Sequence, residues 1–239
     1  MLDSVRIDTE CGRRHFLQNV LSSAVLGVAA QAGIQLAVPE KLSAQNKLTP
    51  DAALQELLAG NQRFVANQLT SIEQDLTVLK ERTVDKQEPF AAVLSCADSR
   101  VPVELIFDQT IGHIFVTRVA GNIVTPEIIA SLEYGVAVLG VKALVVLGHG
   151  GCGAVKAAMK AEVVPGQISS LYPSLRQAVE QSDGNLDKAI EANAKIQAGL
   201  LRSSSTVIRD AFKAEKLKVE AAIYDLATGK VNLSVNRGA

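Results

Sequence analysis

The sequence predicts an α/β fold with a mainly parallel central sheet flanked by helices. Short apolar runs alternate along the chain with longer stretches in which apolar residues recur at helical spacing. The apolar runs are continuous, which is typical of strands that are buried on both faces of a parallel sheet. In addition, 48% of the 239 residues are hydrophobic and 21% are charged, so the chain can bury a sizeable core.

The first helix of this fold is expected over 49–68 (TPDAALQELLAGNQRFVANQ). Thr49 and Asp51 are candidates for its N-cap, Pro50 suits its first turn, and leucines recur at helical spacing after them. The elements expected next are a polar helix at 71–83, a buried strand at 90–95, a short helix at 101–109 and a strand at 113–119.

The second half of the chain continues the alternation. The expected elements are a helix at 125–139, a strand at 143–148, a helix opening at Cys152, helical stretches at 168–181 and 185–213, and two strand segments within 217–235 joined by a turn at 227–230. Sites in such sheets form beyond the carboxyl ends of strands, where Cys96 and His149 both stand. If their strands are neighbours, the two side chains converge.

The first fifty residues differ from the rest. Arg13-Arg14 precede Phe16-Leu17 and an apolar, Ala/Gly-rich segment, a pattern that resembles a twin-arginine export leader. We therefore expect a leader and linker at 1–45, a single domain at 46–239, and export to the periplasm or a lumenal equivalent. Cleavage near 30–32 or near 42–44 fits the pattern, and an uncleaved leader would be the only membrane contact. A disordered basic N-terminus or a single membrane span are the alternatives.

Cysteine and histidine are scarce, so their placement is informative. Cys96 ends one apolar run, and His149 and Cys152 follow another in HGGCGA. Two thiolates and one imidazole suit zinc, and three ligands leave the open position of a catalytic site. A Cys96–Cys152 disulfide and a cysteine nucleophile paired with His149 are alternatives. His113 more often fits a structural position than a fourth ligand.

Asp98 and Arg100 follow Cys96 closely. A guanidinium can hold a carboxylate bidentately, and a carboxylate fixed beside the metal can accept a hydrogen bond from a reactive water. The alternative is an ordinary turn with a local ion pair. The glycine-rich turn lacks the GxxxxGK[ST] phosphate-binding pattern. A net charge of −1 and the absence of long basic runs argue against a nucleic-acid partner.

GNQRF, CADSRVP, FVTRVAGN, SLEY and LGHGGCGA occur in this order, and with them the sequence resembles the β-class carbonic anhydrases. The resemblance runs from about residue 51 to the C-terminus and is densest at 87–155. It implies that family's fold with an N-terminal helical arm, and reversible hydration of carbon dioxide to bicarbonate and a proton. It also implies one Zn²⁺ per chain, held by Cys96, His149 and Cys152, with Asp98 and Arg100 as the catalytic dyad.

The resemblance further implies a carbon dioxide pocket completed by a neighbouring subunit, and hence a homodimer or a higher homo-oligomer. Gln87 would bind substrate oxygen, Phe115 and Tyr134 would form an apolar wall, and the Gly153 backbone would lie near the bound anion. Core packing is the alternative role for both aromatic residues. Two other functions remain open, namely hydrolysis of carbon disulfide or carbonyl sulfide on the same scaffold, and a catalytically silent, zinc-stabilised interaction protein.

Two positions depart from the family pattern. His113 stands where the family usually has an acidic residue. One branch of the family has a regulatory bicarbonate pocket with a Trp three residues before the first ligand. Here that position is Val93, which argues against this pocket although Arg118 matches its arginine.

Overall fold

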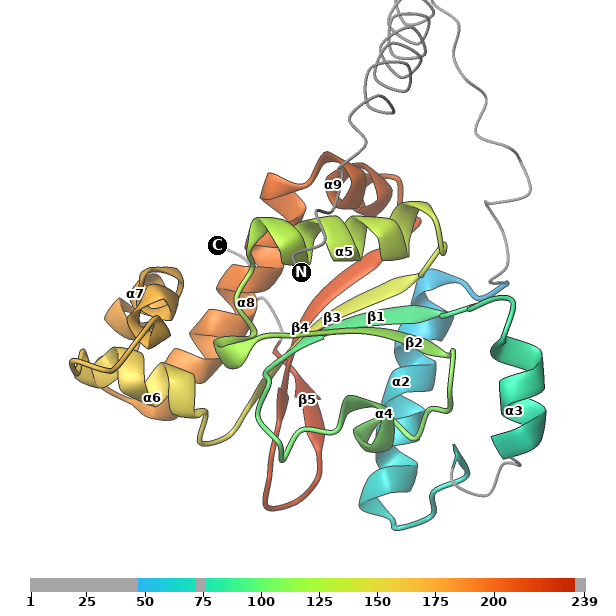
Figure 1. Cartoon of the computed structure of the whole chain (residues 1–239), viewed down its shortest axis with the longest axis horizontal. Helices are drawn as coiled ribbons and strands as arrows, with labels where there is room; N and C mark the ends of the chain where they lie inside the picture. The colour runs from blue at the N-terminus through green and yellow to red at the C-terminus, as the bar shows by residue number, and fades with distance from the viewer. Residues whose placement is uncertain (1–46, 72–75, 235–239) are drawn as a thin grey trace, which may run out of the picture. The chain divides into compact units, whose positions relative to one another are not determined.

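The computed structural model describes residues 47–71 and 76–234 (Figure 1). The predicted leader and linker at 1–45 therefore lie outside the described residues, as does part of the predicted polar helix. Among the residues that are described, no helix combines the length and the apolar character needed to cross a membrane.

A five-stranded sheet with the order β2-β1-β3-β4-β5 forms the centre of the fold. Its strands are β1 (Ala91–Ser95), β2 (Ile114–Arg118), β3 (Ala143–His149), β4 (Lys218–Tyr224) and β5 (Val231–Leu233). The first four strands are parallel, and β5 pairs antiparallel with β4. The predicted mainly parallel sheet is thus confirmed. Because β2 joins one side of β1 and β3 joins the other, the strand order reverses between β1 and β3.

Helices follow the strands as the sequence predicts, and polar caps set several of their starts. The helices are α2 (Pro50–Val65), α3 (Leu76–Thr83), α4 (Val103–Ile106), α5 (Pro126–Ala137), α6 (Gly153–Lys160), α7 (Tyr172–Glu180), α8 (Leu186–Ser204) and α9 (Thr206–Lys213). Thr49 caps α2 through Ala52 N, and Thr125 caps α5 through Ile128 N. Proline occupies the first turn of both helices, where its missing N–H costs nothing.

The single helical stretch predicted at 185–213 is wrong, because the structure has two helices there, α8 and α9. Ser205 has extended backbone angles, φ −107° and ψ 123°, between α8 and α9. Its hydroxyl accepts a hydrogen bond from Ile208 N at 3.1 Å and donates one to Glu133 Oε1 at 2.6 Å. A serine that caps a new helix competes with helix continuation, which apolar periodicity alone does not reveal.

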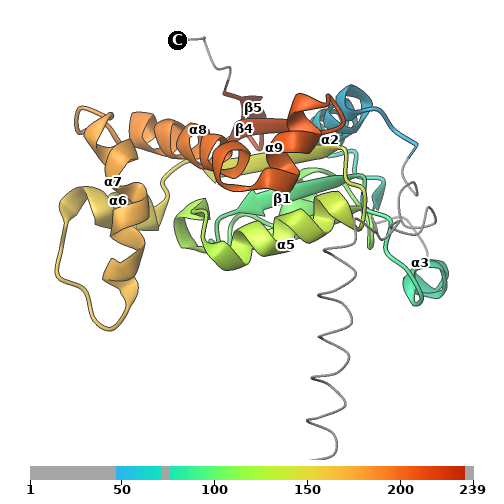
Figure 2. The same cartoon turned by 90° about the horizontal axis from the view of Figure 1, so that it is seen from above.

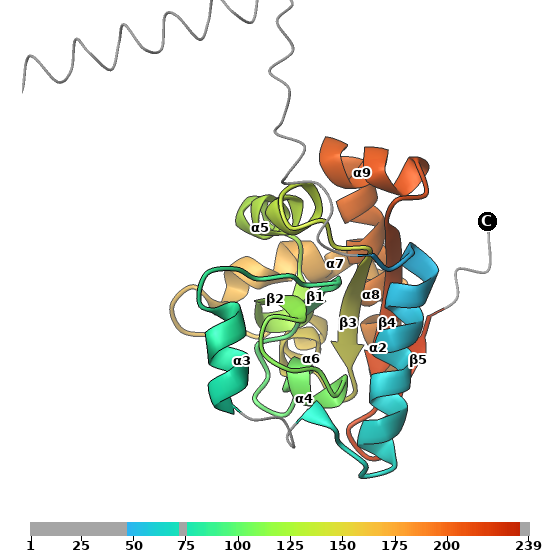
Figure 3. The ribbon, with the colours of Figure 1, turned by 90° about the vertical axis from the view of Figure 1, so that its right-hand side faces the viewer.

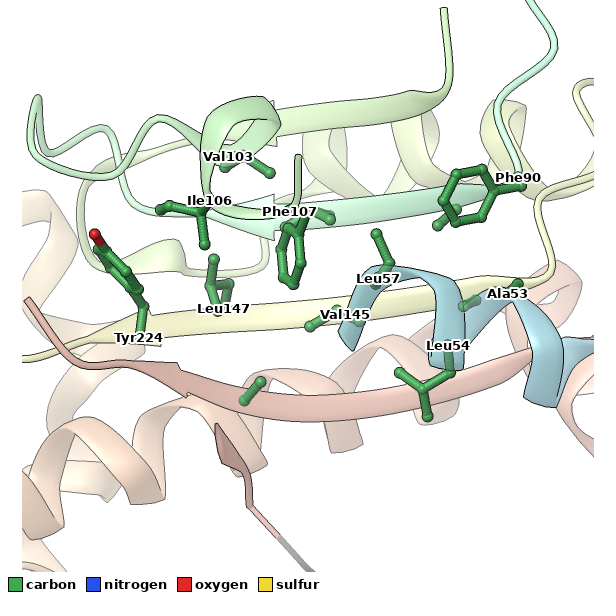
Figure 4. Packing of buried hydrophobic residues seen from close by; sticks show 14 of the residues in the cluster. Ala53, Leu54, Leu57, Phe90, Val103, Ile106, Phe107, Val145, Leu147 and Tyr224 are labelled. Atoms are coloured by element: carbon green, nitrogen blue, oxygen red, sulfur yellow. The ribbon is translucent and has the colours of Figure 1, made fainter. Parts of the chain in front are cut away.

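The helices cover both faces of the sheet (Figure 1). On one face, α2 runs alongside β3 and β4 (Figure 3). Leu57 of α2 and Phe107 pack over Val145 of β3 in this layer (Figure 4). The apolar face of the predicted N-terminal helix is therefore buried against the sheet of its own chain. On the other face, α5, α8 and α9 bury a second apolar cluster against β1, β3 and β4.

A third apolar cluster surrounds the carboxyl ends of β1 and β3. It is built where α6, α7 and α8 lie side by side (Figure 2). Its buried members are Cys96, Ile123, Cys152, Val155, Leu175, Ala189 and Ile190. Two of the three predicted metal ligands thus stand in an apolar layer that excludes water from one side of the site.

Candidate metal centre

Adjacent parallel strands bring the candidate ligands together. Ser95 of β1 pairs with Leu147 of β3, so both strands end at the same edge of the sheet. Cys96 follows β1 directly, and His149 is the last residue of β3. A turn with Gly151 at φ 63° then leads to Cys152, the N-cap residue of α6. The conditional prediction that the two strands are neighbours is confirmed.

Cys96, His149 and Cys152 form a buried cluster whose ligand atoms all lie within 4.8 Å of one another. His149 Nδ1 lies 3.1 Å from the Gly150 carbonyl oxygen, which leaves Nε2 for another partner. Nε2 is buried and has no hydrogen-bond partner. A buried polar atom without a partner is costly, and a metal ion would satisfy it. Two sulfurs and one imidazole nitrogen are ligands that suit zinc, so the residues fit that ion.

The two cysteines are free thiols, so the structure does not contain the alternative Cys96–Cys152 disulfide. Hydrogen bonding with Cys152 lowers the pKa of Cys96 to about 4, and His149 and the Gly121 amide act in the same direction against burial. The neighbouring Cys96 and burial raise the pKa of Cys152. These directions favour a thiolate at Cys96, and the thiolate is the form of cysteine that binds a cation.

Asp98 and Arg100 form the bidentate pair that the sequence predicts. Arg100 Nε donates to Asp98 Oδ1 at 2.9 Å and Arg100 Nη2 donates to Asp98 Oδ2 at 2.8 Å. These hydrogen bonds hold the pKa of Asp98 well below its usual range. Asp98 Oδ2 also lies 3.8 Å from His149 Nε2. An ionised carboxylate thus stands beside the atom that is left for the metal.

Arg118 supports this loop from β2. Its Nε donates to the Cys96 carbonyl at 2.9 Å, and its Nη2 donates to the Asp98 carbonyl at 2.6 Å. The backbone N–H of Gly121 donates to Cys96 Sγ at 3.3 Å. Sequence reasoning matched Arg118 only to a regulatory arginine and assigned Gly121 no role. Both belong to FVTRVAGN, so the motif marked the segment without revealing these contacts.

Gln87 and Tyr134 lie together, but away from the cluster. They share a cavity of about 550 Å³ whose other lining residues are 83–86, 138 and 139, and none of the three metal-ligand candidates lines it. The Phe115 and Tyr134 rings are 6.3 Å apart. Tyr134 is 47% exposed, so the core-packing alternative does not describe its ring. A single chain therefore does not bring Gln87 and Tyr134 to the metal centre.

Gly153 and His113 differ in their relation to the cluster. Gly153 is the first residue of α6, directly after Cys152, and a Cβ there would meet nothing within 4 Å. His113 precedes β2, at the opposite edge of the parallel sheet, and packs edge-on against Phe90 at 6.5 Å. Burial lowers the pKa of His113. The structure thus places His113 apart from Cys96, His149 and Cys152, which does not support it as a fourth ligand.

Known proteins are similar to this chain in sequence. Residues 91–231 match the family model described as carbonic anhydrase. The carbonic anhydrase of Mycolicibacterium smegmatis is 35% identical over 197 residues, which cover 79% of this chain and 95% of that protein. Carbonic anhydrase 2 of Mycobacterium tuberculosis is 33% identical over 192 residues, 77% of this chain and 92% of that protein.

Solved structures are similar as well. The β-carbonic anhydrase CafA of Aspergillus fumigatus superposes with a TM-score of 0.63 at 27% identity, covering 78% of this chain and 92% of that one. The β-carbonic anhydrase CcaA superposes with a TM-score of 0.61 at 25% identity, covering 75% and 86%. Together with the buried Cys-His-Cys cluster at the sheet edge, these similarities show that the chain belongs to the β-class carbonic anhydrase family.

Proposed function

We propose that the chain is a zinc-dependent enzyme that catalyses the reversible hydration of carbon dioxide to bicarbonate and a proton. The observation that carries this proposal is the buried Cys-His-Cys cluster with an unpartnered imidazole nitrogen, beside a carboxylate that an arginine holds bidentately. Family membership and the carbonic anhydrases of known sequence that resemble the chain support the same reaction.

Cys96, His149 and Cys152 would hold one Zn²⁺, which supplies a Lewis acid that makes water acidic enough to act as a nucleophile. Asp98 orients that water. Its carboxylate stays ionised and is therefore only a hydrogen-bond acceptor. It would accept a hydrogen bond from the water's O–H and leave an oxygen lone pair facing carbon dioxide, while the proton released in the reaction leaves to solvent. Arg100 keeps the carboxylate in place, and its Nη2 also reaches the Gly151 carbonyl at 3.4 Å.

We assign the carbon dioxide pocket to an interface between two copies of the chain. Gln87 would bind substrate oxygen, Phe115 and Tyr134 would form the apolar wall, and the Gly153 N–H would face the bound anion. Two features support this assignment. β2 is an edge strand of the sheet, and the exposed Tyr134 ring stands beside it next to a cavity.

Two thiolates donate more negative charge to a metal ion than imidazoles do. Water bound there would therefore have a higher pKa than in an all-histidine site, where the pKa of the bound water is about 7. We expect carbon dioxide hydration to increase as the pH rises above neutrality. Stopped-flow initial rates in matched buffers test this, and a flat profile between about pH 6 and pH 9 would contradict it.

We further propose that residues 1–45 act as a twin-arginine leader that exports the folded, metal-loaded chain. The Arg13-Arg14 pair and the apolar segment after it support this. Replacing both arginines with lysine should leave the protein in the cytoplasmic fraction, while the unchanged chain reaches the periplasm. Equal distribution of the two proteins would refute export by this route.

The first experiment measures carbon dioxide hydration and zinc content on the same sample of the purified chain. We expect about one zinc per chain. Asp98→Ala should retain zinc and lose activity by about 10²- to 10⁴-fold, the range for removing a residue that handles a proton. Asp183→Asn is the matched control, because the Asp183 side chain is 85% exposed and makes only a long ion pair with Lys188.

Other outcomes separate the alternatives. Zinc without hydration, but with turnover of carbon disulfide or carbonyl sulfide, would assign the site to a hydrolase of these sulfur analogues. Zinc without either activity would indicate an interaction protein. A chain that takes up no zinc would refute the metal centre itself.

A further inference from the structure

Two amide side chains are buried in the middle of α8. Asn193 is 1% exposed and Gln197 is not exposed at all. They stand one helical turn apart. The other buried residues of this helix are apolar, namely Ala189, Ile190, Ala194, Ala198 and Leu201. Burying an amide in such a face is favourable only if its hydrogen bonds are made, so their partners reveal what the two residues hold.

Both amides bind the turn that follows β2. Asn193 Nδ2 donates to the Gly121 carbonyl at 2.8 Å, and Gln197 Oε1 accepts from Val124 N at 2.8 Å. Gln197 Nε2 donates to Asn193 Oδ1 at 3.0 Å and to the Ser174 carbonyl at 3.1 Å. The second amide therefore fixes the orientation of the first. Although α8 supplies no candidate ligand, its two buried amides hold the turn at both ends.

The turn in question donates to a metal-ligand candidate. Gly121 N reaches Cys96 Sγ at 3.3 Å. Gly121 has a left-handed conformation, with φ 76° and ψ 11°, which glycine adopts easily. In this conformation its N–H points at the sulfur. Glycine also suits the space here, because a Cβ at this position would lie 3.3 Å from Leu175 of α7 and 3.4 Å from Ala154 of α6. The Asn193 hydrogen bond holds the same residue from the other side.

We propose that Asn193, braced by Gln197, is a positioning residue for the Cys96 sulfur. By holding Gly121 it maintains an N–H···S hydrogen bond that withdraws electron density from the thiolate. The sulfur then donates less charge to the metal ion, which partly offsets the presence of two thiolates in the ligand set. This inference rests on the proposed metal centre and adds a second layer of residues to it, of the kind that tunes a bound metal.

Cobalt substitution provides a direct readout of the sulfur. Co²⁺ bound by thiolates gives a sulfur-to-metal charge-transfer band in the near ultraviolet, whose energy falls when the sulfur loses a hydrogen bond. In the Co²⁺-loaded full chain, Asn193→Leu should move this band to lower energy. The sulfur would then donate more charge, but it would be held less firmly in place, so the variant should bind Co²⁺ about tenfold or more weakly, as is typical when a supporting residue of a metal site is lost. Gln197→Met should move the band in the same direction by a smaller amount.

Ile190→Val is the matched control. Ile190 is buried on the same helix and packs in the apolar cluster that contains Cys96 and Cys152, but its side chain makes no hydrogen bond. The Ile190→Val variant should have a lower melting temperature than the unchanged chain, with the charge-transfer band at the same energy. If Asn193→Leu does not fold, the Gln197→Met spectrum decides the question.

An unmoved band in a folded Asn193→Leu, or in Gln197→Met when it alone folds, overturns the inference. A band that moves equally in Ile190→Val also overturns it, because packing alone would then explain the shift. Absence of any thiolate band in the unchanged chain would instead refute the proposed metal centre, which separates the two failures.

Discussion

Arg100 donates to both oxygens of Asp98, so the carboxylate cannot rotate without losing a charge-assisted hydrogen bond. The backbone N–H of Arg100 adds a third hydrogen bond to Oδ1 at 3.0 Å. This geometry differs from an incidental surface ion pair because the Asp98 side chain is only 16% exposed, whereas Arg100 remains 55% exposed. The Asp98 carboxylate is thus mostly shielded from solvent, while the Arg100 side chain that holds it remains exposed.

Arg100→Lys tests the bidentate geometry. A lysine keeps the charge but donates from one nitrogen, so Asp98 loses one of its two side-chain hydrogen bonds. We expect kcat/KM for carbon dioxide to fall about tenfold, as for the loss of about 1–2 kcal/mol in the transition state, with zinc content unchanged. Arg209→Lys, at an exposed Arg-Asp pair on α9, is the control. Equal rates for Arg100→Lys and the unchanged chain would show that bidentate holding is not needed.

A second carboxylate, Asp108, serves stability. It accepts hydrogen bonds from Arg63 Nε at 2.6 Å, Thr70 Oγ1 at 2.8 Å and Ser71 N at 2.8 Å, and its side chain is fully buried. Burial by itself would raise the pKa of Asp108, but these donors outweigh it and hold the pKa well below its usual range. The residue ties the segment after α2 to the loop after α4.

Asp108→Asn should therefore reveal a pH-dependent stability. Since the folded pKa lies below the unfolded value of about 3.9, the contribution is fully present above that value and is lost as the pH falls toward the folded pKa. We expect the variant to be about 2 kcal/mol less stable at neutral pH, and the difference to shrink below about pH 4. Urea unfolding at several pH values measures it. Asparagine also tolerates the φ of 46° at this position, so backbone strain does not contribute to the measured loss of stability.

At the scale of elements, close helix packing depends on one glycine of the GNQRF segment. Gly60 lies in α2, where an added Cβ would collide with the carbonyl oxygen of Phe107. The collision is with backbone, so no rotamer change can relieve it. Gly60 thus sets how closely α2 can approach the loop after α4, which itself follows the Asp98–Arg100 segment.

Two helical glycines should respond oppositely to alanine. Intrinsic helix propensity favours alanine over glycine by about 1 kcal/mol. At Gly199 in α8 a Cβ meets nothing within 4 Å, so Gly199→Ala should stabilise the chain by about 0.5–1 kcal/mol. Gly60→Ala should destabilise it by about 2 kcal/mol or more, because the collision outweighs propensity. Denaturant unfolding compares the two, and a stabilised Gly60→Ala would contradict the close packing.

At the scale of the whole molecule, the β2 edge of the sheet is the surface most suited to a second copy. It is an outer strand with unpaired backbone groups on one side. Large apolar side chains stand exposed beside it, with Tyr134 and Ile111 at 47% and Leu105 and Val138 at 37%. Such a surface is typical of an interface, and it includes Tyr134, one of the residues assigned to the carbon dioxide pocket.

Tyr134→Arg should separate the copies and reduce activity together. A buried, unpaired charge at an interface is strongly unfavourable, so the mass measured by light scattering should fall to that of one chain. Carbon dioxide hydration should decline in the same sample, because the pocket would be incomplete. Leu200→Arg, on an exposed apolar residue of α8, is the control. A Tyr134→Arg protein of unchanged mass would place the interface elsewhere.

Helices and strands could be predicted from the sequence where apolar periodicity and capping residues agree with how the element packs. Continuous apolar runs such as AAVLS predict buried strands, and Thr49 with Pro50 predicts the start of α2. The break at Ser205 did not follow from apolar periodicity, because a serine N-cap starts α9 there, and the capping hydroxyl is held by Glu133, a residue far away in the chain. Local periodicity contains no information about such a partner.

The same contrast holds for the site. The sequence by itself determined the ligand candidates and the Asp98–Arg100 pair, because cysteine and histidine are scarce and the two charged residues are close in the chain. Only the tertiary structure decided that β1 and β3 are neighbours, with the strand order reversing between them. It also decided that Asn193 and Gln197 reach the turn beside Cys96. Strand order and contacts between distant segments depend on how whole elements pack, and no local sequence pattern encodes them.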